Sequence, residues 1–117
     1  MLINTIKEKY KMATLRVYQP KEEYISVVKQ FIDVEEQNPS KELLDEYYAC
    51  VFETDEMNLP GAFDDEDILL SSVEAMVNVS SKKLRALGAY DVIDIAQKEK
   101  RKQLLLLEDD EYEVIEE

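Results

Sequence analysis

A long segment of one charge sign dominates this chain of 117 residues. Residues 42–81 carry eleven carboxylates and neither lysine nor arginine. Apolar residues recur between those acids at steps of three and four, as at Leu44, Tyr47 and Val51. Disordered acidic tracts lack such residues, whereas this spacing is typical of a helix face that packs against a core. The segment therefore predicts folded helices with an acidic surface.

The composition favours a helical domain. Apolar residues make up 45% of the chain, which is enough for a globular core, but there are only two glycines and three prolines. A fold rich in β-strands turns often and usually needs more of both. The single cysteine, Cys50, excludes an internal disulfide and favours a reducing compartment. With neither a membrane-length apolar run nor the pattern of a secretory signal, we expect a cytoplasmic protein, located in the host cytoplasm if the source is viral.

The net charge of −13 excludes a generic nucleic-acid binder that works by neutralising phosphates. The cations are not spread evenly, because a basic strip lies between the acidic segment and an acidic C-terminus. The strip consists of Lys82, Lys83, Arg85, Lys98, Lys100, Arg101 and Lys102. Two interpretations stay open: the strip neutralises the acidic segments within the fold, or it forms a local docking patch.

The pattern along the chain predicts a mainly α fold, a small four-helix bundle with a short N-terminal β-strand or hairpin. Residues 13–18 alternate as a strand does, and residues 1–12 suit either a partner strand or a first helical turn. Residues 108–117 form a like-charged tail that we expect to be disordered. The domain would thus span residues 1–107, with helices expected over about 20–37, 41–54, 64–80 and 89–106 and a short helical turn over 82–87.

Catalytic and metal chemistry have few candidate residues. The absence of histidine removes the commonest general base and the commonest zinc ligand. The span 55–66 fails as a calcium loop, because Met57 and Leu59 occupy ligand positions and Pro60 stands where the loop needs glycine. We therefore expect a protein that is not an enzyme and has no catalytic, metal or cofactor site.

Two kinds of interaction fit the acidic helices. One is a surface for a basic or amphipathic helical protein partner, held in an apolar groove with an acidic rim. The other is an acidic phage-type inhibitor or DNA mimic that occupies a host DNA-binding or defence protein. A mimic needs carboxylates in exposed rows, whereas here they share helices with core residues and cluster at helix starts. The pattern favours the protein partner, with no direct nucleic-acid binding and no membrane, and leaves self-association open.

Part of the chain resembles the small tail assembly chaperones of long-tailed bacteriophages. The resemblance lies in a strand ending at Pro20, a first helix, a second helix that ends in residues 45–52, and an acidic start to a third in residues 64–73. It implies a non-enzymatic, mostly helical protein that coats the tape-measure protein and helps to recruit tail-tube subunits. Residues 1–12 and the C-terminal third lie outside it.

Aromatic residues beside carboxylates suggest where a partner would bind. We expect Tyr47 and Phe52 to belong to the core. The predicted contact surface consists of Glu46, Tyr48, Asp55, Glu56, Phe63 and Asp64.

Overall fold

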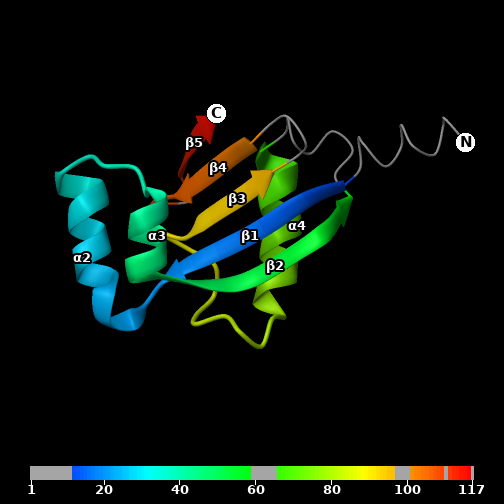
Figure 1. Cartoon of the computed structure of the whole chain (residues 1–117), viewed down its shortest axis with the longest axis horizontal. Coiled ribbons are helices and arrows are strands. Elements are labelled where there is room, and N and C mark those ends of the chain that lie inside the picture. Colours follow the sequence, from blue (N-terminus) through cyan, green and yellow to red (C-terminus); the bar gives the residue numbers. More distant parts are fainter. Residues whose placement is uncertain (1–11, 59–65, 97–100, 110, 117) are drawn as a thin grey trace, which may run out of the picture.

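The computed structural model describes residues 12–58, 66–96, 101–109 and 111–116. They form a mixed α/β fold in which helices pack on a five-stranded antiparallel sheet (Figure 1). The elements in chain order are β1 (Met12–Pro20), η1 (Glu22–Tyr24), α2 (Ile25–Lys29), η2 (Gln30–Val34), α3 (Lys41–Tyr47), β2 (Tyr48–Asn58), α4 (Glu66–Asn78), β3 (Val92–Ala96), β4 (Arg101–Leu106) and β5 (Tyr112–Glu116). The prediction of an all-α four-helix bundle is therefore wrong.

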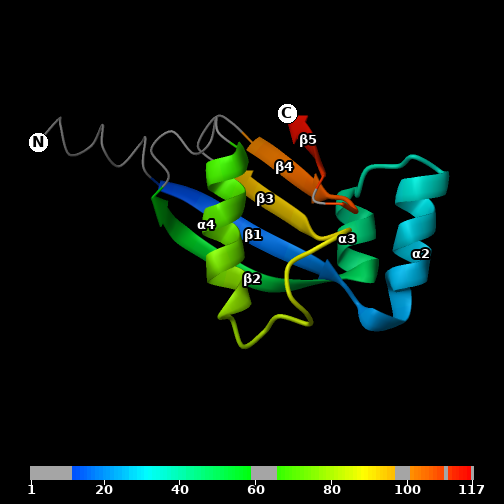
Figure 2. The same cartoon turned by 180° about the vertical axis from the view of Figure 1, so that it is seen from behind.

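The first strand lies inside the sheet, whose strand order is β2-β1-β3-β4-β5. Val17 of β1 pairs with Phe52 of β2 on one side and with Ile93 of β3 on the other. Helix α4 covers one face of the sheet, and Figure 2 views the molecule from that side. Helices α2 and α3 lie together at one end of the sheet, away from α4 (Figure 1).

Helix α4 and the sheet share the larger core. Leu69, Val73 and Val77 follow one another at four-residue steps, so they form one stripe, and all three are fully buried. The stripe packs on every second residue of the strands, because alternate side chains of a strand point to the same face. The strand residues of this core are Ala13, Leu15, Val17, Val51, Ile93, Ile95 and Leu104.

A second core lies between the other face of the sheet and the helices at its end. Val92 belongs to this core whereas its neighbour Ile93 contacts the α4 core, so the two groups of helices occupy opposite faces. Tyr48 closes the second core, since its hydroxyl donates to the carbonyl oxygen of Tyr90 at 2.7 Å. The remaining buried members are Val28, Ile32, Leu43, Leu44, Tyr90 and Leu105.

Several predicted elements are confirmed by the structure. The strand over 13–18 lies within β1, and the helix over about 64–80 corresponds to α4. The helix over about 20–37 appears as the consecutive helical turns η1, α2 and η2. The expectation for residues 1–11 lies outside the described residues.

The other predicted elements are wrong. The helix over 41–54 ends at Tyr47, where β2 begins, and the segment 82–87 forms no helix. The helix over 89–106 is replaced by β3 and β4. Residues 112–116 of the expected disordered tail pair with β4 as β5, with Leu104 opposite Val114.

The scarcity of glycine and proline gave the wrong fold class because the turns use other residues. Glu36, Tyr90 and Asp109 adopt positive φ angles of 52°, 72° and 60°. Left-handed backbone is normally supplied by glycine; among other residues aspartate adopts it readily, as at Asp109, whereas it is less common for glutamate and tyrosine. The number of glycines therefore does not predict where this chain turns.

Candidate functional site

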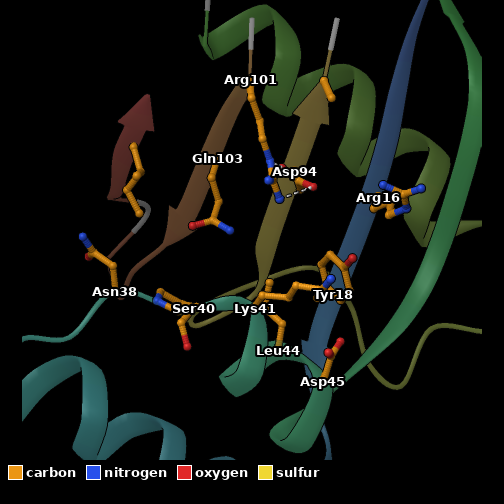
Figure 3. Close-up of a pocket in the computed structure, with 13 residues that line it drawn as sticks. Arg16, Tyr18, Asn38, Ser40, Lys41, Leu44, Asp45, Asp94, Arg101 and Gln103 are labelled. Carbon is orange, nitrogen blue, oxygen red and sulfur yellow. Dashed lines mark hydrogen bonds and ion pairs between the residues drawn. The ribbon is translucent and has the colours of Figure 1, made fainter. Parts of the chain in front are cut away.

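A polar hollow of about 720 Å³ lies on the sheet face opposite α4. Its floor is formed by β1, β3, β4 and β5, and the loop 38–40 with the start of α3 forms its wall (Figure 3). Three cations line the hollow, Arg16, Lys41 and Arg101, together with the carboxylates Asp45 and Asp94.

Charges in this polar hollow are largely paired within the fold. The guanidinium of Arg101 donates to both carboxylate oxygens of buried Asp94, at 2.9 and 3.2 Å (Figure 3). Arg16 forms an ion pair with Glu53, with 2.5 Å between Nε and Oε2. Cross-strand pairs of opposite charge stabilise a sheet, so these contacts are explained by the fold itself.

A second hollow of about 560 Å³ lies between α4, the segment 87–89 and the turn that joins β4 to β5. Its larger apolar residues, which include Leu70, Leu87 and Tyr112, are half-buried. Among the residues that line it, all the charged ones are carboxylates. We call this hollow the acidic groove, lined by Leu70, Glu74, Leu87, Gly88, Ala89, Leu106, Leu107, Glu108, Asp109, Glu111 and Tyr112.

The β4–β5 turn carries three of the four carboxylates of the acidic groove, and contacts of its backbone fix where they start. Leu107 N donates to the carbonyl oxygen of Glu111 at 2.8 Å, and Asp109 takes the left-handed conformation between them. Glu108 is held from outside the turn by the Lys29 ammonium at 3.4 Å. The rim of the groove is therefore built into the fold, and the fourth carboxylate, Glu74, faces it from α4.

The hydroxyl of Tyr90 ties the acidic groove to the helices of the second core. It contacts Glu108 Oε1 at 2.9 Å and Asp33 Oδ2 of η2 at 2.6 Å. Burial raises the pKa of the Tyr90 hydroxyl, and its hydrogen bonds to both carboxylates raise it further. The phenol therefore keeps its proton, which it shares between two acceptors.

A loop over residues 79–91, which we call the 79–91 loop, supplies the third wall of the groove. Fully buried Gln19 fixes this loop through its side-chain amide. Its Oε1 accepts from Leu84 N at 2.7 Å and Arg85 N at 3.3 Å. Its Nε2 donates to Arg85 O at 2.9 Å and to Asp91 Oδ2 at 3.0 Å. One side chain thus satisfies three backbone groups of a loop that has no regular secondary structure.

Asp91 fixes the end of the 79–91 loop that borders the acidic groove. Its Oδ2 accepts from the backbone N–H of Gly88 at 2.8 Å. Only 1% of Asp91 is exposed, and its Oδ1 has no hydrogen-bond partner in the described part of the chain. Burial raises the pKa of Asp91 to about 6, although Gln19, Gly88 and the charge of Arg85 each lower it.

The members of the predicted contact surface that the structure describes differ in their exposure. Glu46 is exposed at the end of α3, and Asp55 is exposed on β2, where it accepts from the Thr14 hydroxyl at 3.2 Å. Tyr48 is only 3% exposed and belongs to the second core. The side chain of Glu56, and all of Phe63 and Asp64, lie outside the described residues.

Sequence reasoning missed the acidic groove because its residues come from three distant segments. Residues 104–112 are a run of four leucines followed by acidic residues and a tyrosine, a pattern that by itself predicts a helix end and an acidic tail. A turn flanked by apolar residues was the only local signal available.

Over the described ranges, no helix is long and apolar enough to cross a membrane, and no three Cys, Asp or Glu side chains are grouped to hold a metal ion. No protein-family model, curated protein or solved structure matches the chain.

Proposed function

We propose that this chain is a non-enzymatic protein-binding module whose acidic groove holds a cationic, amphipathic segment of its partner. The lining of the acidic groove is the main support for this proposal. The groove combines a half-buried apolar floor with four carboxylates, and no lysine or arginine lines it.

The two features of the groove favour one kind of partner. Apolar side chains inserted over the leucines would be removed from water, which contributes roughly 25 cal/mol per Å² of buried area. Lysine and arginine beside them would face the carboxylates, which speeds association and rejects acidic competitors. A helix or turn with one apolar face and cationic edges meets both demands.

Binding of a tape-measure protein and tail-tube subunits, as in a phage tail assembly chaperone, is a specific form of this proposal. The family resemblance implied a mostly helical chain, and the sheet removes that part of its support. A long amphipathic client would still suit the groove. Mimicry of DNA is less favoured. A mimic needs carboxylates in an exposed row, whereas the carboxylates of the acidic groove surround an apolar floor.

Charge reversal in the acidic groove is expected to weaken binding of a basic amphipathic peptide. The probe is a fluorescein-labelled helical peptide with leucine on one face and lysine on the other, titrated by fluorescence anisotropy. The variant Glu74→Lys with Glu111→Lys should raise the Kd about tenfold or more, because two attractions become repulsions in a partly desolvated site. The affinity of the unmodified protein should fall as salt is added.

The matched control is Glu22→Lys with Glu23→Lys, which makes the same change in net charge on exposed residues of η1. It should keep most of the affinity. If it loses as much as the groove variant does, the peptide senses overall charge and the groove is not its site.

Affinity purification with mass spectrometry tests for a natural partner. A partner captured by the unmodified protein, and lost in the Glu74→Lys, Glu111→Lys variant, supports the proposal. A tape-measure or tail-tube protein among such partners would support the chaperone role, and a host DNA-binding protein would favour the inhibitor instead.

A further inference from the structure

The first part of the 79–91 loop exposes an apolar and cationic surface. Val79 is 85% exposed and Leu84 is 49% exposed, which are large fractions for aliphatic side chains. Lys82 and Lys83 are exposed beside them, and neither forms an ion pair with a carboxylate of the described residues. Lys82 and Lys83, two residues of the basic strip, therefore form no ion pair that would neutralise an acidic residue of the described fold.

This surface is held in place and does not collapse onto the protein. Ser80 Oγ donates to the carbonyl oxygen of Val51 and accepts from Lys82 N, both at 3.2 Å. Lys83 Nζ donates to the carbonyl oxygen of Asn78, which leaves its positive charge in place. Gln19 fixes the backbone at Leu84. A loop anchored by a buried side chain keeps its outward residues available to a partner.

The loop carries the chemistry that the acidic groove requires. It offers two exposed aliphatic side chains and two ammonium groups that form no ion pair with the described carboxylates, although that of Lys83 also donates to Asn78 O. The groove offers an apolar floor and four carboxylates, of which Glu108 is already paired with Lys29. None of residues 79–85 lines the groove of its own copy. We propose that residues 79–85 of one copy dock into the acidic groove of a second copy. This inference rests on the proposed function of the groove.

The net charge of the chain sets how such self-association depends on salt. Two copies of charge −13 repel each other at long range, and this repulsion is screened beyond about 8 Å at physiological ionic strength. Contacts between lysine and carboxylate act at shorter range and weaken only at higher salt. Association should therefore rise from low to physiological salt and then fall, whereas a purely attractive electrostatic contact would only fall.

A single loop buries less surface than a standard interface, so the association is expected to be weak. The contact is heterologous unless two copies exchange loops about a two-fold axis.

Sedimentation velocity at protein concentrations up to about 1 mM tests the proposal, because this range detects self-association with a Kd as weak as about 1 mM. The unmodified protein should show a mass that rises with concentration. The loop variant Lys82→Glu with Lys83→Glu, and the groove variant Glu74→Lys with Glu111→Lys, should each remain monomeric when alone. Mixed together they should associate again, because an intact or charge-reversed loop then meets a groove of opposite charge. Circular dichroism of each variant checks that the fold is kept.

Two results would overturn the self-docking. One is an unmodified protein that stays monomeric at every concentration and salt, and the other is a loop variant that associates as the unmodified protein does. If the basic peptide still binds the groove in either case, only the self-docking fails. If the peptide fails to bind as well, the proposed function of the groove fails with it.

Discussion

Replacing Gln19 with leucine is expected to lower the free energy of unfolding by about 4 kcal/mol, although leucine has a similar volume. The change leaves Leu84 N, Arg85 N and Arg85 O without the partner that now satisfies them. An unpaired buried polar group costs about 1–3 kcal/mol, and opening of the loop to water limits the total. Since small domains have only about 5–15 kcal/mol of stability, this loss would be conspicuous in urea denaturation.

The control is Gln103→Leu on β4, a half-buried residue of the polar hollow that is not part of this network. It should change stability by less than about 1 kcal/mol. Hydrogen exchange locates the effect, because in the Gln19→Leu variant the amides of Leu84 and Arg85 should lose protection first. Unchanged stability together with unchanged exchange at these two amides would show that Gln19 does not hold the loop.

Replacing Asp91 with asparagine is expected to alter how stability depends on pH. The pKa of Asp91 is raised from 3.8 to about 6 in the folded protein, so the folded state binds this proton more tightly than the unfolded state does. The resulting stabilisation is complete below about pH 4 and is lost as pH rises through about 6. It amounts to roughly 3 kcal/mol, at 1.36 kcal/mol for each pH unit. Asparagine keeps an oxygen for Gln19 and Gly88 but cannot titrate.

Urea denaturation at intervals between pH 4 and pH 7 measures this effect as a difference between the two proteins. Other carboxylates titrate in both proteins and largely cancel. Relative to the variant, the unmodified protein should gain about 3 kcal/mol on going from pH 7 to pH 4. Two curves that stay parallel over this range would show that Asp91 keeps an ordinary pKa in the folded state.

The sequence was sufficient for the elements whose signals are local. The stripe Leu69, Val73 and Val77 identified α4, because a helix satisfies its own backbone and its period appears within one segment. The alternation around Leu15 and Val17 identified β1 for the same reason.

Strands β2, β3 and β4 were missed because long-range pairing decides them. Val92, Ile93, Asp94 and Ile95 are consecutive and all buried, since both faces of β3 are covered where they lie. A short apolar run of this kind fits a buried helix segment as well as a central strand, so periodicity cannot separate them. Tyr48 and Val51 likewise have helical spacing, but β1 provides the hydrogen-bond partner that makes β2 a strand.

The acidic groove could not be predicted from the sequence, because it too depends on contacts between distant segments. An excess of carboxylates was visible, and so was the possibility of an apolar groove with an acidic rim. The particular groove needs α4 to lie beside the β4–β5 turn, and only the sheet order brings Glu74 near Glu111.

The interior position of β1 in the sheet has a consequence for synthesis of the chain on the ribosome. Translation proceeds at roughly 5–20 residues per second, so β1 emerges seconds before β3, which must hydrogen-bond to its inner edge. Strand β2 and helix α4 precede β3 in the chain and can contact β1 during that interval, but the backbone edge of β1 that pairs with β3 has no partner yet. A nascent polypeptide with such an unpaired edge is vulnerable to aggregation. Completion of the sheet must therefore wait until β3, β4 and β5 have been synthesised, long after β1.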